Sequence, residues 1–146
     1  MSRYFTIEEA EALLPEVGKS MRAAIEFRRY LLIAEEILGR ESHRIEMSGG
    51  AMVDAPRLSE EKSRRDTCAA QIEANIEHIH SLGCEIKDLN SGVLDFRTLY
   101  KGEEVYLCWE LGESGISYWH GLQEGFAGRK PVDEEFRRNH RGRRER

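Results

Sequence analysis

The stretch that decides the fold is EVYLCWELGESGISYWH, residues 104–120. Aromatic and β-branched residues on both sides of a glycine-containing turn are typical of a β-hairpin. Side chains alternate between the two faces of a strand. In the first strand this gives an apolar face, which we expect to pack on helices, and a more polar face. The apolar face holds Val105, Leu107, Trp109 and Leu111, and the polar face holds Tyr106, Cys108 and Glu110.

The length of the turn decides which face His120 joins. With a four-residue turn over 112–115, the histidine lies on the apolar side, opposite Leu107. With a five-residue turn, Cys108 faces Tyr118, and His120 joins the polar face. A slip of one residue moves every side chain to the other face of the sheet. Both registers are open at this point.

Further strand and turn signals surround this hairpin. A short strand is expected over 84–88, followed by a turn at Asn90-Ser91-Gly92 and a second strand over 93–96. Lys101-Gly102 then turns into the strand over 104–111, and the fourth strand covers 116–120. Consecutive hairpins predict a four-stranded antiparallel β-meander with one face on the helices.

The chain opens on a helix start. Thr6 and Glu9 have the spacing of a capping box, in which each side chain accepts a hydrogen bond from the backbone of the other. We expect this first helix to be short, because Pro15 cannot donate a backbone hydrogen bond and disfavours helical geometry at the residue before it. Proline is well suited to the first turn of a second helix, which we expect over 15–40.

Two long amphipathic helices then follow each other. Apolar residues recur at three- and four-residue steps over 15–40 and again over 59–82, and Gly83 is the expected stop. Between them, Ser48-Gly49-Gly50 and Ala55-Pro56 predict a loop over 43–58. Two such helices joined by a loop favour an antiparallel helical hairpin.

These elements predict an α+β fold. It consists of a long antiparallel helical hairpin plus a short N-terminal helix, packed on a four-stranded antiparallel β-meander. The length of 146 residues fits a single domain, which we place at 1–132. The remaining segment, 133–146, is rich in arginine and is expected to be a disordered tail.

Composition narrows the class of protein. No run approaches the roughly 20 apolar residues that span a bilayer, and the N-terminus lacks the apolar core of a secretory signal. Three cysteines without a C-x-x-C pair argue against a disulfide framework and against a zinc ribbon. We therefore expect a reduced, cytoplasmic protein with no membrane association.

Charge also limits the partners. The net charge is −5, but residues 136–146 alone hold six arginines and one glutamate, so the rest of the chain is strongly acidic. A nucleic-acid-binding domain needs a basic face on its folded part. Nucleic-acid contact is therefore expected only as a weak, salt-sensitive interaction of the tail.

The polar face of the hairpin contains the candidate metal ligands. In the five-residue register Cys108, Glu110 and His120 share a surface, which Asp95 also reaches. Thiol, imidazole and carboxylate together suit zinc or iron. The plainer interpretation is that His120 is a hydrogen-bonded packing residue. A Cys108–His120 nucleophile pair is disfavoured, because no helix start follows the cysteine to lower its pKa.

Four residues are candidates for binding a small ligand. Asp95 and Glu113 offer carboxylates, although the second lies in a hairpin loop where it can accept backbone N–H groups instead. Trp119 offers an aromatic platform, although core packing is the commoner role. Arg129 follows glycines that do not match a phosphate loop. It is a candidate for binding an anion, although an ion pair with an acidic residue of the folded domain is the commoner role.

These segments together resemble the bacterial domain of unknown function 2203 family. The resemblance covers residues 3 to 132 and includes the opening Tyr4-Phe5-Thr6 and the Gly125–Arg129 run. Its other segments are Gly83–Asp88, Gly92–Phe96, Val105–Trp109, Gly112-Glu113 and Tyr118–His120. The resemblance implies a small, single-domain bacterial protein and implies no activity. The arginine-rich tail departs from the pattern.

The sequence favours a non-enzymatic, homodimeric interaction or assembly module. A helical hairpin this long has more apolar surface than four short strands can cover, and leftover apolar surface favours self-association in a four-helix arrangement. No recognised catalytic motif is present. The alternative is a domain that binds a metal or small ligand through the Cys/His/carboxylate cluster on the meander.

Overall fold

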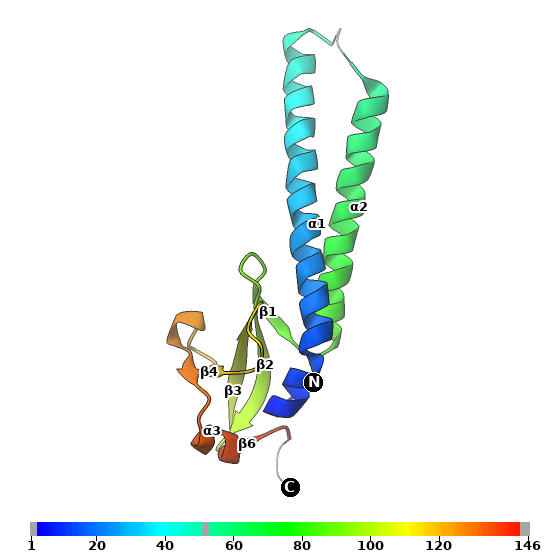
Figure 1. Ribbon diagram of the computed structural model, residues 1–146. Helices are drawn as coiled ribbons and strands as arrows, with labels where there is room; N and C mark the ends of the chain where they lie inside the picture. The colour runs from blue at the N-terminus through cyan, green and yellow to red at the C-terminus, as the bar shows by residue number, and fades with distance from the viewer. Residues whose placement is uncertain (1–2, 51–52, 144–146) are drawn as a thin grey trace. The chain divides into compact units, whose positions relative to one another are not determined.

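The computed structural model describes residues 3–50 and 53–143 and has an α+β fold (Figure 1). A long helix pair, α1 (Ile7–Met47) and α2 (Ala55–Ser81), precedes an antiparallel sheet. The sheet has six strands, whereas four were expected. The remaining elements are β1 (Glu85–Asp88), β2 (Val93–Tyr100), β3 (Glu103–Glu110), β4 (Tyr118–Gly121), the 3-10 helix η1 (Phe126–Gly128), β5 (Lys130–Pro131), α3 (Glu134–Asn139) and β6 (His140–Arg141).

The chain divides into two compact units. One, the sheet unit, comprises Met1–Arg22 and Ile76–Arg146, so it holds the sheet with the start of α1 and the end of α2. The other, the helical unit, comprises Ala23–Asn75 and holds the rest of the helix pair. Among the described residues, no helix combines the length and the apolar character that crossing a bilayer requires.

The capping box at the start of α1 is confirmed. The backbone N–H of Glu9 donates to Thr6 Oγ1 at 3.1 Å, and the N–H of Thr6 donates to Glu9 Oε1 at 3.1 Å. Phe5, just before the cap, is fully buried and packs edge-on against Phe96 of β2, with ring centroids 5.2 Å apart. The cap therefore also fixes where α1 enters the sheet unit.

The expected helix break at Pro15 is wrong, because α1 continues through the proline. A proline inside a helix removes one hydrogen bond and costs about 3 kcal/mol. That cost is offset by packing on both sides of Pro15. Buried apolar residues recur along one face at helical spacing across it: Ala10, Leu14, Val17 and Met21. Tertiary burial along this stripe thus overrides the local preference.

The expected loop over 43–58 is shorter than predicted. Helix α1 extends to Met47, and α2 begins at Ala55. Asp54, which was not predicted to be a cap, accepts the N–H of Arg57 at 3.1 Å and so provides an N-cap. Residues 51–52 of the expected loop lie outside the described residues. At the other end of α2, Gly83 has a positive φ of 96°, as a helix stop requires.

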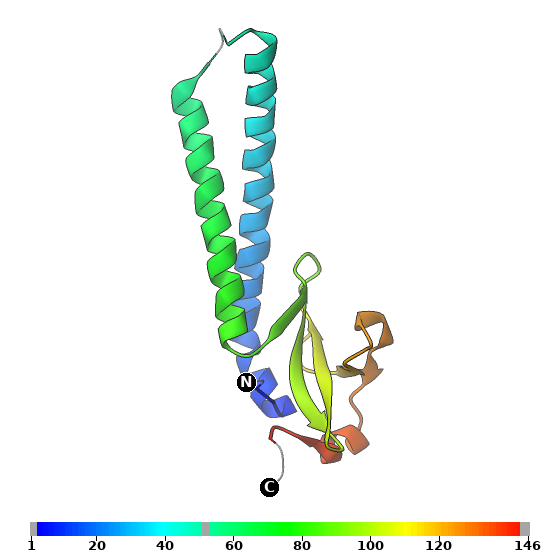
Figure 2. The same ribbon diagram turned by 180° about the vertical axis from the view of Figure 1, so that it is seen from behind.

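The first four strands form the predicted antiparallel meander, and two short strands extend it. The order is β1-β2-β3-β4-β5, and β6 pairs with β2 (Figure 2). Strands β5 and β6 have two residues each, too few for alternation to be visible in sequence. Tyr100 pairs with Glu103 across the Lys101-Gly102 turn, and both turn residues have positive φ, as a type I′ hairpin requires.

The β3–β4 register is the one expected from the five-residue turn. Cys108 pairs with Tyr118, and Tyr106 pairs with His120. His120 therefore lies on the polar face of β3. On the opposite face, Leu107 is fully buried and Trp109 lies against Gly18 of α1, as predicted for the helix-packed side. The polar face is buried as well, which the alternation pattern did not predict.

The segment expected to be a disordered tail is structured over 133–143. Asp133 caps α3 by accepting the N–H of Phe136 at 2.8 Å. Phe136 is 1% exposed and stacks on Tyr100 and Trp119. The single aromatic residue of this charged segment therefore anchors it to the sheet, and β6 then pairs with β2. Residues 144–146 of the expected tail lie outside the described residues.

The helical unit buries little. Among its described residues, the buried apolar side chains are all small: Ala24, Ala34 and Cys68. Larger apolar residues of α1, including Leu32 and Ile33, are about half exposed. Glu41 is buried and links the two helices through Arg57 of α2, at 3.6 Å.

Candidate metal centre

Three strands each contribute one residue to a buried cluster of Asp95, Cys108 and His120. Asp95 of β2 lies directly opposite Cys108 of β3. His120 of β4 is paired with Tyr106, so it lies diagonally from the cysteine on the same face. The potential ligand atoms of the three residues all lie within 4.8 Å of one another. Their exposures are 0%, 0% and 3% respectively.

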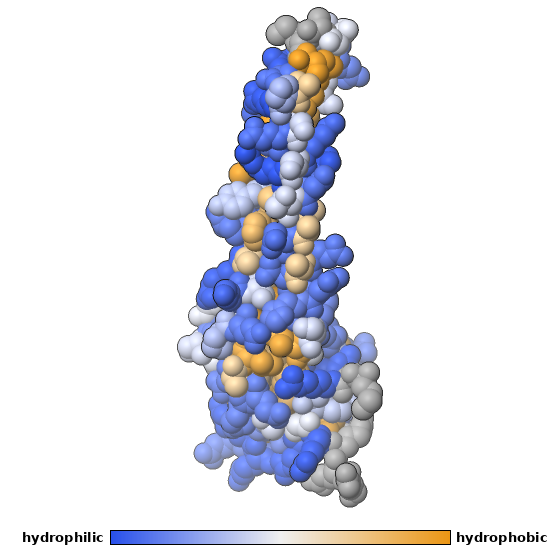
Figure 3. All heavy atoms as spheres, turned by 90° about the vertical axis from the view of Figure 1, so that its right-hand side faces the viewer, coloured by the Kyte–Doolittle hydropathy of each residue, from blue (hydrophilic) through white to orange (hydrophobic). Residues whose placement is uncertain are grey.

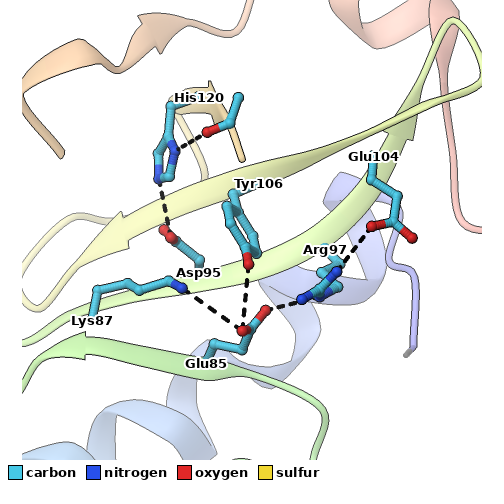
Figure 4. Close-up of polar contacts among 8 residues, drawn as sticks. Glu85, Lys87, Asp95, Arg97, Glu104, Tyr106 and His120 are labelled. Carbon is cyan, nitrogen blue, oxygen red and sulfur yellow. Dashed lines mark hydrogen bonds and ion pairs between the residues drawn. The ribbon is translucent and has the colours of Figure 1, made fainter. Parts of the chain in front are cut away.

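The ring of His120 is held from both sides. Its Nε2 lies 3.0 Å from Asp95 Oδ2, and its Nδ1 lies 2.9 Å from the carbonyl oxygen of Gly121 (Figure 4). A carbonyl only accepts, so Nδ1 carries the proton. The close contact at Nε2 then requires one further proton, either on the imidazole or on the carboxyl group.

Asp95 is a fully buried carboxyl group with few polar partners. Apart from His120 and the neighbouring thiol of Cys108, neither of its oxygens has a hydrogen-bond partner among the described residues. Burial raises the pKa of this carboxyl group, and the neighbouring His120 and Cys108 offset only part of that rise. A carboxylate at this position therefore lacks the compensation that buried charges usually have.

The thiol of Cys108 stays protonated at neutral pH. Burial raises its pKa to about 12, the nearby Asp95 carboxylate adds to the rise, and Arg129 opposes it. Thiolates, not thiols, act as nucleophiles. The environment therefore argues against the Cys108–His120 nucleophile pair that the sequence already disfavoured.

A small pocket opens onto the cluster. It has a volume of about 140 Å³, and both Asp95 and His120 form part of its wall. Lys87, Tyr106 and Phe126 line other sides of it. A volume of this size holds a few water molecules or a small ligand. The cluster is thus buried in the sheet, and two of its three residues, Asp95 and His120, also line a cavity.

A second polar network adjoins the cluster on the same face of the sheet (Figure 4). Arg97 of β2 donates to Glu85 and to Glu104, each at 2.9 Å. The hydroxyl of Tyr106 lies 3.4 Å from Glu85, and Lys87 lies 3.7 Å from the same carboxylate. These charges neutralise one another within the network.

Glu110, a predicted metal ligand, lies outside the cluster. It belongs to the same strand as Cys108 but pairs with Val93, two positions beyond the Asp95–Cys108 pair. Glu113 of the following turn accepts the backbone N–H of Glu110 at 2.7 Å. The carboxylate that approaches the thiol and the imidazole is Asp95, which was expected both to reach this surface and to bind a small ligand.

The other candidates have structural partners. Arg129 pairs with Glu113 at 3.1 Å and lies over the rings of Tyr118 and Phe126, at 3.9 and 4.1 Å from their centroids. Trp119 lies on the opposite face of the sheet, opposite Leu107. None of these three candidates is among the converging ligand residues, although the guanidinium of Arg129 approaches the thiol of Cys108.

The Lys101-Gly102 turn contains a signal from which the position of Asp95 opposite Cys108 can be predicted. A two-residue turn fixes the pairing of β2 with β3, and counting back from it places Asp95 opposite Cys108. Lys87 and Tyr106, which line the pocket, were missed as site residues. Nothing in their local sequence distinguishes them from ordinary strand residues.

The fold and this cluster define an α+β protein with a buried Asp/Cys/His centre beside a small pocket. The family model described as "Uncharacterized conserved protein (DUF2203)" matches residues 3–132, and the chain belongs to that family. Neither the comparison with curated proteins nor the comparison with solved structures finds a match. The family identification thus agrees with the resemblance seen in the sequence and assigns no activity.

Proposed function

We propose that this protein binds one divalent transition-metal ion, of the zinc class, through Asp95, Cys108 and His120. The single observation that supports this most strongly is the convergence of three different ligand types within 4.8 Å at a fully buried point. A cation there would balance the buried carboxylate of Asp95 and would favour the thiolate form of Cys108.

The hydrogen bonding of His120 supports its role as a ligand in this proposal. A metal-bound histidine usually donates its second ring N–H to a carbonyl or carboxylate, which fixes the ring orientation. In His120 the Nδ1 proton points to Gly121, which leaves Nε2 facing the other two ligands. The ion would replace the proton that Nε2 and Asp95 now share.

The distances fit a tetrahedral ion after small side-chain movements. Metal–ligand bonds of about 2.0–2.3 Å place two ligands roughly 3 to 4 Å apart on such an ion. Three protein ligands would leave one coordination position on such an ion, and Asp95 and His120 both line the pocket. Mixed sulfur, nitrogen and oxygen ligands favour zinc, with iron as the alternative.

Metal content of protein purified without chelator or affinity tag tests this proposal, followed by titration of metal-free protein with Zn²⁺ and Co²⁺. We expect one equivalent per chain and a Co²⁺ spectrum with a thiolate charge-transfer band. Asp95→Asn, Cys108→Ala and His120→Gln should each weaken binding on the order of tenfold or more. Cys84→Ala and Glu110→Gln are matched controls that should bind normally.

Two results would reject the metal site. One is metal binding below a stoichiometric amount even after loading with zinc, iron or manganese. The other is equal loss of metal in the Cys84→Ala control, which would mean that binding depends on general stability. Circular dichroism of each variant separates loss of a ligand from loss of the fold.

The helical unit supports a second proposal, self-association. No large apolar side chain among its described residues is buried, and Tyr30, Leu32 and Ile33 are 46%, 55% and 48% exposed. Figure 3 shows apolar patches that interrupt the hydrophilic surface of the helical part. Patches of this kind mark interaction surfaces. Sedimentation equilibrium of the full chain should show a dimer at tens of micromolar, and a monomer there would reject this proposal.

The protein then combines an assembly surface with a metal centre, and we assign no reaction to it. All three cysteines are free and buried. Free thiols persist in a reducing compartment, so a cytoplasmic location fits both proposals.

A further inference from the structure

The charges along the exposed part of α1 are arranged symmetrically in position but with opposite sign. Arginines precede Leu32 at the same spacings at which glutamates follow it. Residues 28–36 are RRYLLIAEE, with two arginines four and three residues before Leu32 and two glutamates three and four residues after it. The segment lies within one uninterrupted helix. Both pairs of charged residues are therefore placed symmetrically about Leu32.

Helical spacing brings these residues onto one face. At 3.6 residues per turn, Ile25, Leu32 and Gly39, each seven apart, follow one stripe. Positions 28, 29, 35 and 36 flank that stripe on both sides. The face is open to solvent: Leu32 is 55% exposed, and the side chains of Arg29 and Glu36 are 66% and 63% exposed.

We propose that this face pairs with the same face of a second copy, antiparallel and about a two-fold axis at Leu32. The inference rests on the proposed self-association and names its surface. Arg28 and Glu35 lie on one flank of the stripe, and Arg29 and Glu36 lie on the other. Arg28 would then lie beside the partner's Glu35, and Arg29 beside the partner's Glu36. Leu32 would meet its own counterpart at the axis. A two-fold interface requires this kind of self-complementarity.

The charge pattern also selects the direction of pairing. In a parallel, in-register pair, each arginine would face an arginine and each glutamate a glutamate, which is unfavourable. Within one chain, Arg29 lies 3.4 Å from Glu26 and Arg40 lies 2.6 Å from Glu36. Both pairs are exposed, and such pairs are weak. They can therefore be exchanged for contacts between copies.

Gly39 provides an independent observation for the same arrangement. Glycine in a helix interior is unfavourable, and beyond the helix's own nearby backbone a Cβ at this position would meet no atom of residues 3–50 and 53–143 within 4 Å. No contact among these residues therefore requires glycine there. In the antiparallel pair, Gly39 lies opposite the partner's Ile25, and the absent side chain leaves room for it.

Charge reversal on the full-length chain tests the pairing. R28E/R29E and E35R/E36R should each weaken dimerisation on the order of tenfold or more in sedimentation equilibrium, because like charges then face each other. The combined variant R28E/R29E/E35R/E36R should restore the dimer. An equimolar mixture of the two reversed proteins should form a mixed dimer. K62E/R65E, an equal reversal on α2, is the matched control and should leave dimerisation unchanged.

The possible results distinguish failure of the Leu32 pairing from failure of self-association as a whole. A wild-type monomer would reject self-association and this surface together. A wild-type dimer that survives both reversals would keep self-association and reject the Leu32 pairing. Loss of the dimer in both reversed proteins without recovery in the combined variant would also reject it. Circular dichroism confirms that each variant keeps its helices.

Discussion

At the scale of single residues, burial raises the pKa of two thiols of the sheet unit. Cys84 and Cys108 are 2% and 0% exposed, and burial raises the pKa of each thiol to about 12. No carboxylate contributes to the raised pKa of Cys84, whereas Asp95 contributes to the raised pKa of Cys108. Cys84 is therefore the simpler thiol on which to measure the effect of burial alone.

Cys84 should make the protein less stable in alkali. Its pKa rises from 9.0 in the unfolded chain to about 12 in the fold. The thiol therefore stabilises the fold fully below pH 9, and this contribution is lost as the pH rises towards 12. The slope is about 1.4 kcal/mol per pH unit for one group. In urea unfolding between pH 8 and 11, Cys84→Ala should show a shallower decline than wild type. Parallel curves would contradict this prediction.

Gly92 should tolerate no side chain. Its φ is +73°, and a Cβ there would lie 2.6 Å from Cβ of Leu111. Positive φ costs a non-glycine residue about 1–2 kcal/mol, and the close contact adds about 1–3 kcal/mol. Gly102→Ala is a matched control, because Gly102 has φ of +82° and open space around it. Chemical unfolding should show a larger loss for Gly92→Ala, and equal losses would exclude the contact with Leu111.

At the scale of elements, single side chains decide whether weakly predicted segments fold. Helix α3 has six residues, well below the length at which a helix is stable alone. It is held by its Asp133 cap and by Phe136, which stacks between Tyr100, Trp119 and His140. Strand β6 follows directly, so its pairing with β2 depends on the same anchor.

Phe136→Ala should release α3 and β6 together. Removing a buried phenylalanine costs about 3–5 kcal/mol, more than a six-residue helix and a two-residue strand can offset. We expect a lower melting temperature, rapid proteolysis after the arginines of this segment, and a change in the fluorescence of Trp119, whose ring lies 4.9 Å from Phe136. Glu134→Ala, on the exposed side of α3, is the control. Unchanged proteolysis would show that Phe136 is not the anchor.

At the scale of the whole molecule, the two proposals concern different units. The metal ligands belong to the sheet unit, and the Leu32 face belongs to the helical unit. Both tryptophans, Trp109 and Trp119, lie in the sheet unit, whereas most helical residues lie in α1 and α2. Tryptophan fluorescence and helical circular dichroism therefore report different parts of the chain.

Zinc and protein concentration should consequently shift different thermal transitions. Ligand at a thousand times Kd stabilises a fold by about 4 kcal/mol, so zinc should raise the midpoint seen by tryptophan fluorescence. A higher protein concentration should raise the midpoint seen by circular dichroism, because dimers gain stability by mass action. Cys108→Ala should abolish only the first shift, and R28E/R29E only the second. Identical shifts in both signals would mean that the units unfold as one.

Much of the fold was predictable from local patterns. Periods of 3.6 and 2 separated the helices from the strands, the Thr6–Glu9 capping box marked the start of α1, and Gly83 marked the end of α2. These signals work because caps, turns and alternation depend on residues close together in the chain. The break expected at Pro15 failed because the compensating burial comes from packing across the proline, which no local pattern contains.

The sequence by itself determined the α+β class, the four central strands, the family and the residue types of the candidate centre. Only the tertiary structure decided that His120 lies on the same face as Cys108, that the carboxylate of Asp95 and not that of Glu110 comes within ligand distance of both, and that Phe136 orders the C-terminal segment. The physical reason is the distance along the sequence between the residues that interact. Secondary structure follows from neighbours in the chain, whereas strand register and burial depend on contacts between residues far apart in the sequence.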